Sequence, residues 1–377
     1  MTNNSKTLPW ENLDPEEFGE DMVDAIRNLN SDDPEVRMES LNDLFDMGWH
    51  QGTLCWQAPF IPPFLRQFLP QGTEEEKEWI LFILASFATG TSYCDTRKER
   101  PNFVYYNIKN TPEFQARLER EKRLVRDTYE AVYKGVNLYL DLLEDDSAKV
   151  KIAAAYALSC CPKDADTIIP QLQQRFHCEP DEMVKVTIPL CLTFISKTTP
   201  VDAGFFEEII NSEETDFVKL SAAVSLAYVA GEKMSDNVFE KLIQLLEIPK
   251  LFNRLEEHYD IIATAHYWMV IDFFERLGEK HKVEIIPILT RISPIYGLDT
   301  AIEVFFGEAK IPEGTTFENL TESQQLGLKA LANDESTWNG SFSNTIVTGI
   351  IGIKGSSARE ERQKLIDFIN GEPLKYD

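Results

Sequence analysis

The chain has 377 residues, with 63 acidic and 37 basic side chains and a formal net charge of −26. Such a negative field repels phosphate backbones, which argues against nucleic-acid binding over most of the surface. A basic protein partner is the more compatible one, although acidity also keeps a large protein soluble without any partner.

Cysteine usage and the apolar stretches predict a reduced protein that does not enter a membrane. The cysteines form no C-x-x-C pair and no regular framework, which is typical of reduced, buried thiols. The amino end lacks the apolar core of a signal peptide, and the most apolar stretches, 79–88 and 261–274, are too short or too interrupted to cross a bilayer. We expect a soluble, cytoplasmic protein. The six cysteines are Cys55, Cys94, Cys160, Cys161, Cys178 and Cys191.

The first helical pairs are predicted upstream of residue 90. Residues 1–30 are expected to cap the amino end. The motif Asp-Pro-Glu-Val-Arg at 33–37 puts a proline in the first turn of a helix, where it costs no hydrogen bond. A partner helix is predicted from about 58 to 69. The next pair is predicted to begin with a helix at 74–88, whose partner is delayed until 127–143.

Residues 90–126 are therefore interpreted as an insertion. Nine basic and four acidic residues between Arg97 and Arg126 give that segment a net charge of +5, which leaves −31 for the rest of the chain. Aromatic residues, including Tyr105 and Tyr106, alternate there with cations such as Arg100. Insertions into repeat proteins project from one face, often the binding face.

Two interpretations of the insertion stay open. In the first, the segment is a clamp over a binding groove. In the second, it is a self-docking arm or a plain extension of the helices, which the alternating Arg and Glu residues of 115–126 favour because such a face forms internal ion pairs in water.

A period of 34 residues runs through the middle of the chain. The pairs Val150-Lys151, Val184-Lys185 and Val218-Lys219 recur at that interval, and apolar residues two, four and eight positions after each valine also coincide. Each unit contains two apolar helical faces separated by a proline or a short polar turn, which predicts an antiparallel helical hairpin. Because one hairpin cannot bury both faces, neighbouring units must stack.

Downstream of about residue 250 the period loosens. A long helix is predicted at 255–277, followed by helices at 283–292 and 298–306. Two more are predicted at 321–333 and 357–369. Terminal repeats are usually atypical because one of their faces meets water.

The residues that carry a family resemblance lie inside and outside the repeat. Asp-Pro-Glu-Val-Arg at 33–37 and Lys-Val-Lys-Ile-Ala-Ala-Ala-Tyr-Ala-Leu at 149–158 resemble the first helix of HEAT repeats of the lyase-type, HEAT-like variety. The whole chain is similar to a group of bacterial HEAT-repeat proteins with no established activity. That similarity lies in residues 50–53, 58–65, 130–135, 320–324 and 331–332.

The resemblance implies an all-α fold, an α-α superhelix of the HEAT/ARM-like solenoid type. We expect a single solenoid from 1 to 377. It would consist of the cap at 1–30, helical repeats at 31–308 with the insertion at 90–126, and an irregular helical cap at 309–377.

The turn at 50–53 is the first candidate binding site. His50, Gln51 and Thr53 cluster there between Trp49 and Trp56, which are the ingredients of a recognition site on a loop. The alternative is purely structural, with Gly52 ending a helix, His50 and Thr53 capping neighbouring helices, and both tryptophans packed inside.

A second candidate lies on the long carboxyl-terminal helix. His258 and His266 are eight residues apart, which is about 12 Å along a helix and too far for one metal ion. We expect a polar strip that faces a binding groove. The binding candidates of the insertion are Arg97, Arg100, Tyr105 and Tyr106.

No enzyme signature is visible, since the chain has neither a Gly-rich phosphate loop nor G-x-S-x-G. We expect a non-catalytic protein–protein interaction scaffold or adaptor with an acidic concave surface and no metal or cofactor. One version is a bacterial immunity-type protein that binds a basic, nuclease-like toxin. The alternative is a HEAT-like enzyme or ligand carrier. A bilin-lyase-like protein would need a deep cavity near Trp49, His50 and Trp56. A DNA-glycosylase-like protein would need a positively charged groove.

Overall fold

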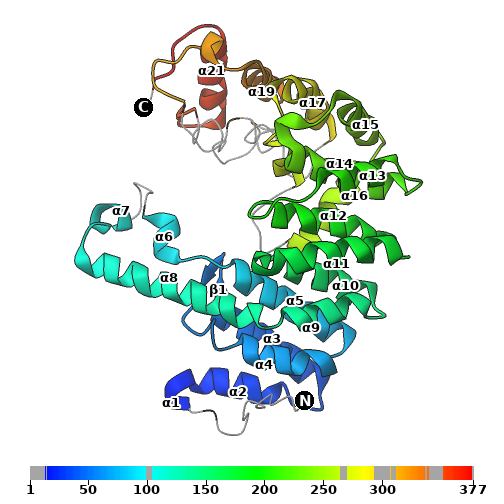
Figure 1. Ribbon diagram of the computed structural model, residues 1–377. Coiled ribbons are helices and arrows are strands. Elements are labelled where there is room, and N and C mark those ends of the chain that lie inside the picture. The colour runs from blue at the N-terminus through cyan, green and yellow to red at the C-terminus, as the bar shows by residue number, and fades with distance from the viewer. Residues whose placement is uncertain are drawn as a thin grey trace. The chain divides into compact units, whose positions relative to one another are not determined.

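The computed structural model describes residues 13, 15–98, 104–263, 270–292, 306, 311–335, 338 and 351–375. Helices make up nearly all the secondary structure of these residues, and their strands form a single two-stranded hairpin, so the prediction of an all-α fold is confirmed (Figure 1). The chain divides into two compact units, Met1–Thr199 with Ile262–Tyr267, and Pro200–Ile261 with Trp268–Asp377. A single solenoid across the whole chain therefore stays a prediction.

The first unit is a stack of helices in which α10 packs against α5 on one side and α12 on the other. Helix α3 packs against α2 and α5, α9 packs on α10, and α11 packs on α10 and α12. Its elements are α1 (Pro15–Phe18), α2 (Glu20–Asn28), α3 (Pro34–Gly48), β1 (Trp49–His50), β2 (Thr53–Leu54), α4 (Pro62–Phe68), η2 (Leu69–Gln71), α5 (Glu74–Thr89), α6 (Tyr93–Arg97), α7 (Val104–Ile108), α8 (Pro112–Tyr133), α9 (Val136–Asp141), η3 (Leu142–Glu144), α10 (Ala148–Ser159), η4 (Pro162–Asp164), α11 (Ala165–Cys178) and α12 (Glu182–Ser196).

The 34-residue period is the interval at which successive helices begin. Helices α10, α12 and α14 (Asp216–Ala230) begin 34 residues apart, each directly after an N-cap residue. The side chains of these caps, Ser147, Asp181 and Thr215, accept hydrogen bonds from backbone N–H groups in the first turn. Such a cap satisfies a donor that the helix itself leaves unpaired. The repeated Val-Lys pair thus occupies the third and fourth positions of each helix.

The basic member of that pair joins neighbouring helices. In the first unit, the cation at the fourth position of one helix binds a carboxylate at the start of the next helix in the stack. These inter-repeat ion pairs are Arg37–Glu76 at 2.7 Å, Lys77–Asp145 at 2.9 Å and Lys151–Glu179 at 3.0 Å. The second pair bridges α5 and the turn before α10 across the whole insertion, so the insertion leaves the stack continuous.

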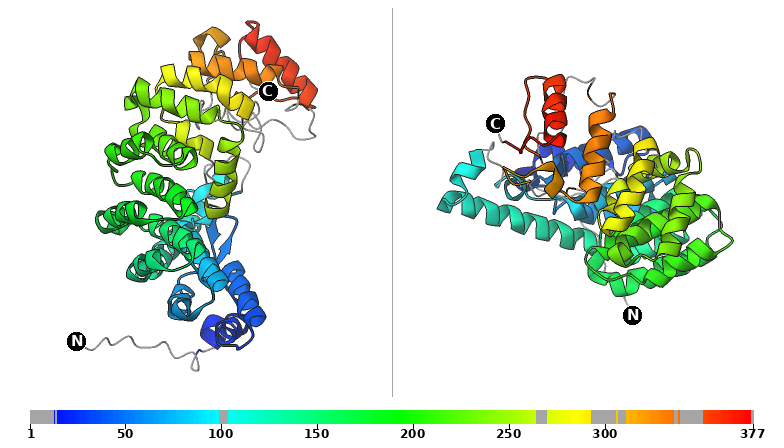
Figure 2. Two further views of the ribbon diagram at one scale, coloured as in Figure 1. Left: turned by 90° about the vertical axis from the view of Figure 1, so that its right-hand side faces the viewer. Right: turned by 90° about the horizontal axis from the view of Figure 1, so that it is seen from above.

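The insertion forms an arm, which we define as α6, α7 and the part of α8 up to residue 126. Helix α8 runs without a break from Pro112 to Tyr133, so the predicted partner helix at 127–143 is wrong in its start and its end. Gly135 follows two residues later as the N-cap of α9, and a Cβ atom there would lie only 2.3 Å from the Tyr139 hydroxyl. Figures 1 and 2 show the arm projecting from the helical stack of its unit.

The second unit is also helical. Helix α14 packs against α13 and α15, α17 against α15 and α19, and α19 against α21. Its further elements are α13 (Ala203–Asn211), η5 (Gly231–Lys233), α15 (Asp236–Leu246), α16 (Leu251–Ala263), η6 (Val270–Phe274), α17 (Glu279–Ile292), η7 (Phe317–Asn319), α19 (Glu322–Asn333) and α21 (Ala358–Ile369).

The predictions for this unit are confirmed in part. The helices at 321–333 and 357–369 match α19 and α21, which follow the N-caps Thr321 and Ser357. The continuous helix predicted at 255–277 is wrong at its carboxyl end, because residues 270–274 form the 3-10 helix η6. The helix predicted at 298–306 lies outside the described residues except for Phe306.

Candidate functional site

A β-hairpin interrupts the first helical pair where the sequence predicts a turn. Trp49 pairs with Leu54 and His50 with Thr53, in antiparallel register. The two linking residues, Gln51 and Gly52, have φ angles of 48° and 81°. Two successive positive φ angles are the mark of a type I′ turn, whose twist matches that of the strands it joins.

This geometry corrects the structural interpretation of the turn. The Thr53 hydroxyl does not cap a helix but donates a 2.8 Å hydrogen bond to the His50 carbonyl within the hairpin. The glycine closes a hairpin rather than a helix. Gln51 and His50 are exposed at its tip.

The hairpin is fixed to the base of the arm. Leu54 N–H donates to the Thr91 carbonyl at 3.0 Å, and Thr91 N–H donates to the Gly52 carbonyl at 2.9 Å. Gly90 is required at this junction because a Cβ atom there would lie 2.4 Å from the Leu54 side chain. The hairpin and the arm therefore share one rigid attachment.

The two tryptophans that flank the hairpin differ in their environment. Trp49 is half-buried and stacks on Phe45, with ring centroids 5.1 Å apart. Trp56 is 52% exposed and lies beside Phe60, which is also exposed. The expectation that both tryptophans pack inside is therefore wrong for Trp56.

The sequence predicts a helix from about 58 to 69, which would include Phe60. Helix α4 instead begins at Pro62, and the residues between Leu54 and Pro62 form turns. Two consecutive prolines favour the first turn of a helix, so the Pro62-Pro63 pair was the signal that could have placed Phe60 in a loop.

A partly buried hydrogen-bond network holds the arm together. The Glu121 carboxylate on α8 accepts hydrogen bonds from Ser92 Oγ and Cys94 N–H, both at 2.8 Å, and from Arg117 Nε at 2.9 Å. Cys94 Sγ lies 3.1 Å from the same carboxylate. Burial by itself would raise the pKa of Glu121, but these hydrogen bonds together lower it. The pKa of Cys94 is raised to about 12. Burial is the larger cause, and the neighbouring Glu121 carboxylate is the second.

A small apolar core completes the arm. Cys94, Phe114 and Leu118 are buried together, with Tyr105 packed against them. The arm therefore has a small core of its own, and both interpretations of the insertion stay predictions. Of its predicted binding residues, Tyr105 faces this core, while Tyr106 is exposed. Arg100 lies outside the described residues.

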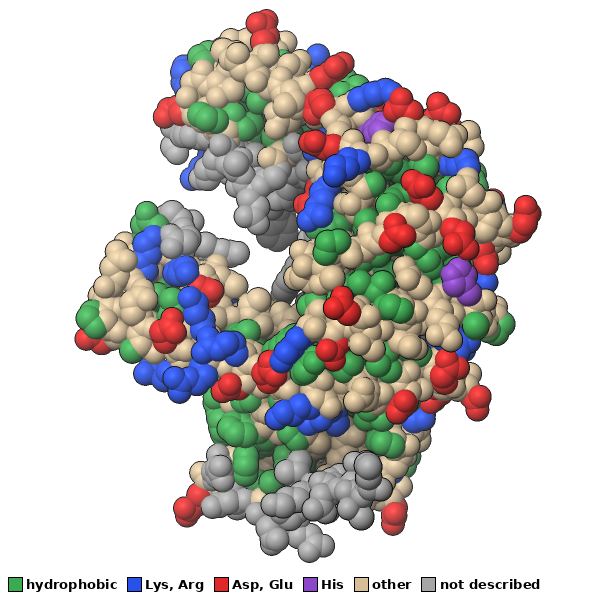
Figure 3. Space-filling view, viewed as in Figure 1, with side chains coloured by type: hydrophobic (Ala, Val, Ile, Leu, Met, Phe, Trp, Pro, Cys, Tyr) green, Lys and Arg blue, Asp and Glu red, His purple; other side chains and the backbone are tan. Residues whose placement is uncertain are grey.

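The surface of the arm combines apolar side chains with cations. Its exposed apolar residues are Tyr93, Val104, Tyr106 and Ile108. Arg97 lies over the Tyr93 ring at 3.9 Å and Lys109 over the Tyr106 ring at 4.5 Å, distances typical of cation–π contacts. Figure 3 shows Lys and Arg side chains gathered along the arm.

In the second predicted site, the one histidine that the structure describes is buried. His258 on α16 is only 5% exposed, and Glu256 on the same helix is also buried. His266 lies outside the described residues. Within the described part of the chain, no group of three or more His, Cys, Asp or Glu side chains is placed to hold a metal ion.

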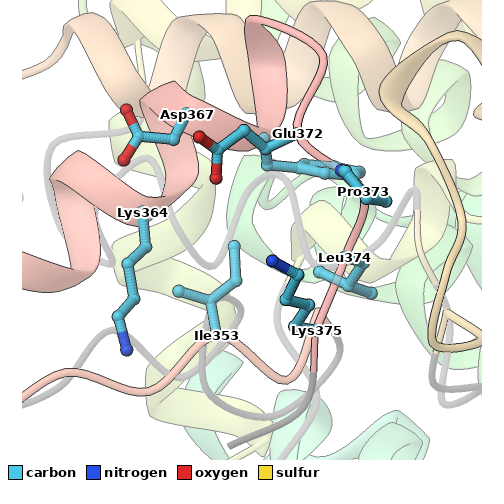
Figure 4. Close-up of a pocket in the computed structure, with 8 residues that line it drawn as sticks. Ile353, Lys364, Asp367, Glu372, Pro373, Leu374 and Lys375 are labelled. Atoms are coloured by element: carbon cyan, nitrogen blue, oxygen red, sulfur yellow. The ribbon is translucent and has the colours of Figure 1, made fainter.

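A shallow pocket of about 150 Å³ lies beside α21 in the second unit (Figure 4). Lysines and carboxylates share its lining with apolar residues. Ligand sites usually enclose about 300 Å³ or more, so the pocket is small for an organic cofactor. Its lining comprises Ile353, Lys364, Asp367, Phe368, Glu372, Pro373, Leu374 and Lys375.

The buried cysteines do not resemble activated nucleophiles. A reactive thiol needs a lowered pKa. Burial instead raises the pKa of the thiols of Cys55, Cys160, Cys161 and Cys191. The prediction of buried thiols is confirmed for most cysteines, but Cys178 is exposed and Cys55 half-buried.

Fold and surface together define an all-α protein. In the part of the chain that the structure describes, its most exposed large apolar side chains lie where the helical stack of the first unit is interrupted. No family model, curated protein or solved structure matches the chain. Among the described residues, no helix is both long enough and apolar enough to cross a membrane.

Proposed function

We propose that this protein is a non-catalytic scaffold or adaptor that binds another protein. One observation carries the proposal. Within the described part of the chain, the large apolar side chains that are most exposed, Trp56, Phe60, Tyr93, Val104, Tyr106 and Ile108, all belong to the hairpin region (residues 49–60) or to the arm. Exposed apolar groups gathered in one region mark interaction sites, and aromatic residues are the side chains most often found at binding hot spots.

The architecture proposed for this scaffold is a right-handed α-α superhelix of the HEAT-like type. Its support is the 34-residue spacing of α10, α12 and α14 and the inter-repeat ion pairs of the first unit. A stack of this kind presents a long continuous surface to a partner.

The charge of the chain favours a basic partner at the hairpin region. Asp43 and Asp46, which are exposed on the last turns of α3, lie six and three residues before Trp49. Carboxylates near an aromatic side chain speed the association with a basic protein and disfavour acidic ones. The aromatic ring, once buried in the complex, supplies the affinity. A basic nuclease-like toxin, bound in the manner of an immunity protein, is one partner of this chemistry.

A photo-crosslinking amino acid at position 56 tests the proposal in cells of the native host. The expected result is one dominant covalent adduct with a basic protein. The same residue placed at Glu208, which is exposed on α13 in the regular part of the array, is the matched control and should yield no such adduct. Equal labelling at both positions, or adducts with acidic proteins only, would contradict the proposal.

A further inference from the structure

The arm has a surface chemistry opposite to that of the rest of the molecule. The segment from Arg97 to Arg126 carries a net charge of +5, whereas the remainder carries −31. A partner drawn to the acidic surface is repelled by the arm, and a partner drawn to the arm is repelled by the acidic surface. The arm therefore fits a ligand of its own.

The cations of α8 are available to such a ligand. Arg120, Arg123 and Arg126 are exposed, and they form no ion pair with any residue that the structure describes. Their spacing of three residues places them on one side of the helix. Phe114 and Leu118 occupy the opposite side, buried in the core of the arm. The three arginines thus form a strip on the side of α8 away from this core, a side that they share with the exposed Glu119.

Two exposed aromatic rings of the arm, Tyr93 and Tyr106, lie directly under cations. Val104 is 65% exposed on α7, and Tyr106 and Ile108 follow on the same short helix. Lys109 lies over the Tyr106 ring. A ligand that meets both features must offer apolar side chains beside negative charges.

We propose that the arm is a docking site for an acidic protein segment that carries apolar side chains among its carboxylates. This inference rests on the proposed function, because it assigns a second partner chemistry to the same scaffold. Arginine pairs with carboxylates through two parallel hydrogen bonds, which gives the strip directional specificity. The protein would then join a basic partner at the hairpin region to an acidic one at the arm.

A protein segment fits this surface better than other polyanions do. Val104 and Ile108 are aliphatic and offer no flat ring for a base to stack on, so they contribute little to binding single-stranded nucleic acid. An anionic membrane is a broad surface that brings more of the acidic remainder near its charges than a short peptide does. A peptide can contact the arm alone.

Selection from a random peptide display library on the immobilised full-length protein tests the inference. The peptides that are enriched should combine Asp or Glu with Leu, Ile, Phe or Trp. One enriched peptide, labelled with a fluorophore, then measures affinity for variants of the full chain. Arg120→Glu/Arg123→Glu and Val104→Ser/Ile108→Ser should each weaken binding about tenfold or more, which corresponds to losing two contacts of ordinary strength.

The matched control is Lys233→Glu/Arg359→Glu, which makes the same change of charge at exposed positions of the second unit. It should alter affinity less than about twofold, because neither residue belongs to the arm. Circular dichroism of each variant should match the parent, since all four arm residues are exposed.

Several outcomes would overturn the inference. They are the enrichment of basic or uncharged peptides, no enrichment at all, equal affinity in the arm variants, and tighter arm-dependent binding to phosphatidylserine vesicles or single-stranded DNA than to the peptide. Failure here is distinguishable from failure of the proposed function. Crosslinking at position 56 depends on the hairpin region, and it persists if only the arm lacks a ligand.

Discussion

At the scale of single residues, Glu179 has the most demanding position in the first unit. Its side chain is fully buried between Lys151, which donates to both carboxylate oxygens at 3.0 Å, and Arg175, whose Nε lies 3.0 Å away. It also accepts a hydrogen bond from the backbone of Asp181, the N-cap of α12. The largely buried Lys151, one of the two ion pairs of Arg175 and the start of α12 therefore depend on one carboxylate.

Glu179→Ala should destabilise the protein by about 3–5 kcal/mol, because it leaves the largely buried Lys151 without its counter-charge and leaves Arg175 with only the exposed Glu144 as an ion-pair partner. Urea unfolding followed by circular dichroism measures the change. Glu130→Ala is the control, since it removes an exposed 3.0 Å pair with Lys163 and should cost no more than about 1 kcal/mol. Equal effects of the two substitutions would show that the buried pair does not hold the repeats together.

Residues also explain what the sequence could not predict at the candidate site. The hairpin has strands of only two residues, which is too short for an alternating apolar pattern. Gly52 was visible as a turn residue, but the positive φ of Gln51 was not, because glutamine has no preference for that conformation. The exposure of Trp56 depends on how the chain packs in three dimensions, which composition does not encode.

At the scale of elements, one hydrogen-bond network joins α6 to α8 within the arm. Glu121 on α8 holds the start of α6 through Ser92 and Cys94. The pKa of Glu121 is lower in the folded protein than its ordinary value of 4.5, so the folded state binds fewer protons than the unfolded state. This network therefore stabilises the arm fully above pH 4.5, and its contribution is lost as the pH falls through the lowered pKa.

Acid should consequently open the arm. Labelling of Cys94 by 4,4′-dithiodipyridine, measured by mass spectrometry relative to the exposed Cys178, should accelerate as the pH falls below 4.5. In Glu121→Gln, labelling should already be fast at neutral pH and should lose this dependence. An unchanged pH profile in the variant would mean that another group controls the opening.

The elements show where sequence reasoning works. The starts of α10, α12 and α14 follow from the 34-residue period and their N-cap residues, both of which are local signals. The helical character of 115–126 was predicted correctly, and its continuation to Tyr133 could have been, because no proline or glycine interrupts α8 after Pro112. The small core around Phe114 could not have been predicted from the sequence, because it forms through tertiary contacts between α6 and α8.

At the scale of the whole molecule, regular and irregular parts have different roles in our account. The regular helices bury their apolar faces and join through ion pairs, so they supply rigidity. The hairpin region and the arm expose aromatic and aliphatic side chains at fixed positions, and they are the proposed binding surfaces. Composition predicted a basic partner for the acidic surface, whereas the opposite preference of the arm needed its exposed strip of arginines to be located.

Hydrogen–deuterium exchange of the full chain, with and without the basic partner captured at position 56, tests the central claim most directly. Backbone amides of residues 49–60 should exchange more slowly in the complex, because a docked partner excludes water from the hairpin region and suppresses its local opening. Amides of α10, α12 and α14 should be unchanged. Protection confined to those regular helices, with none at residues 49–60, would contradict the account.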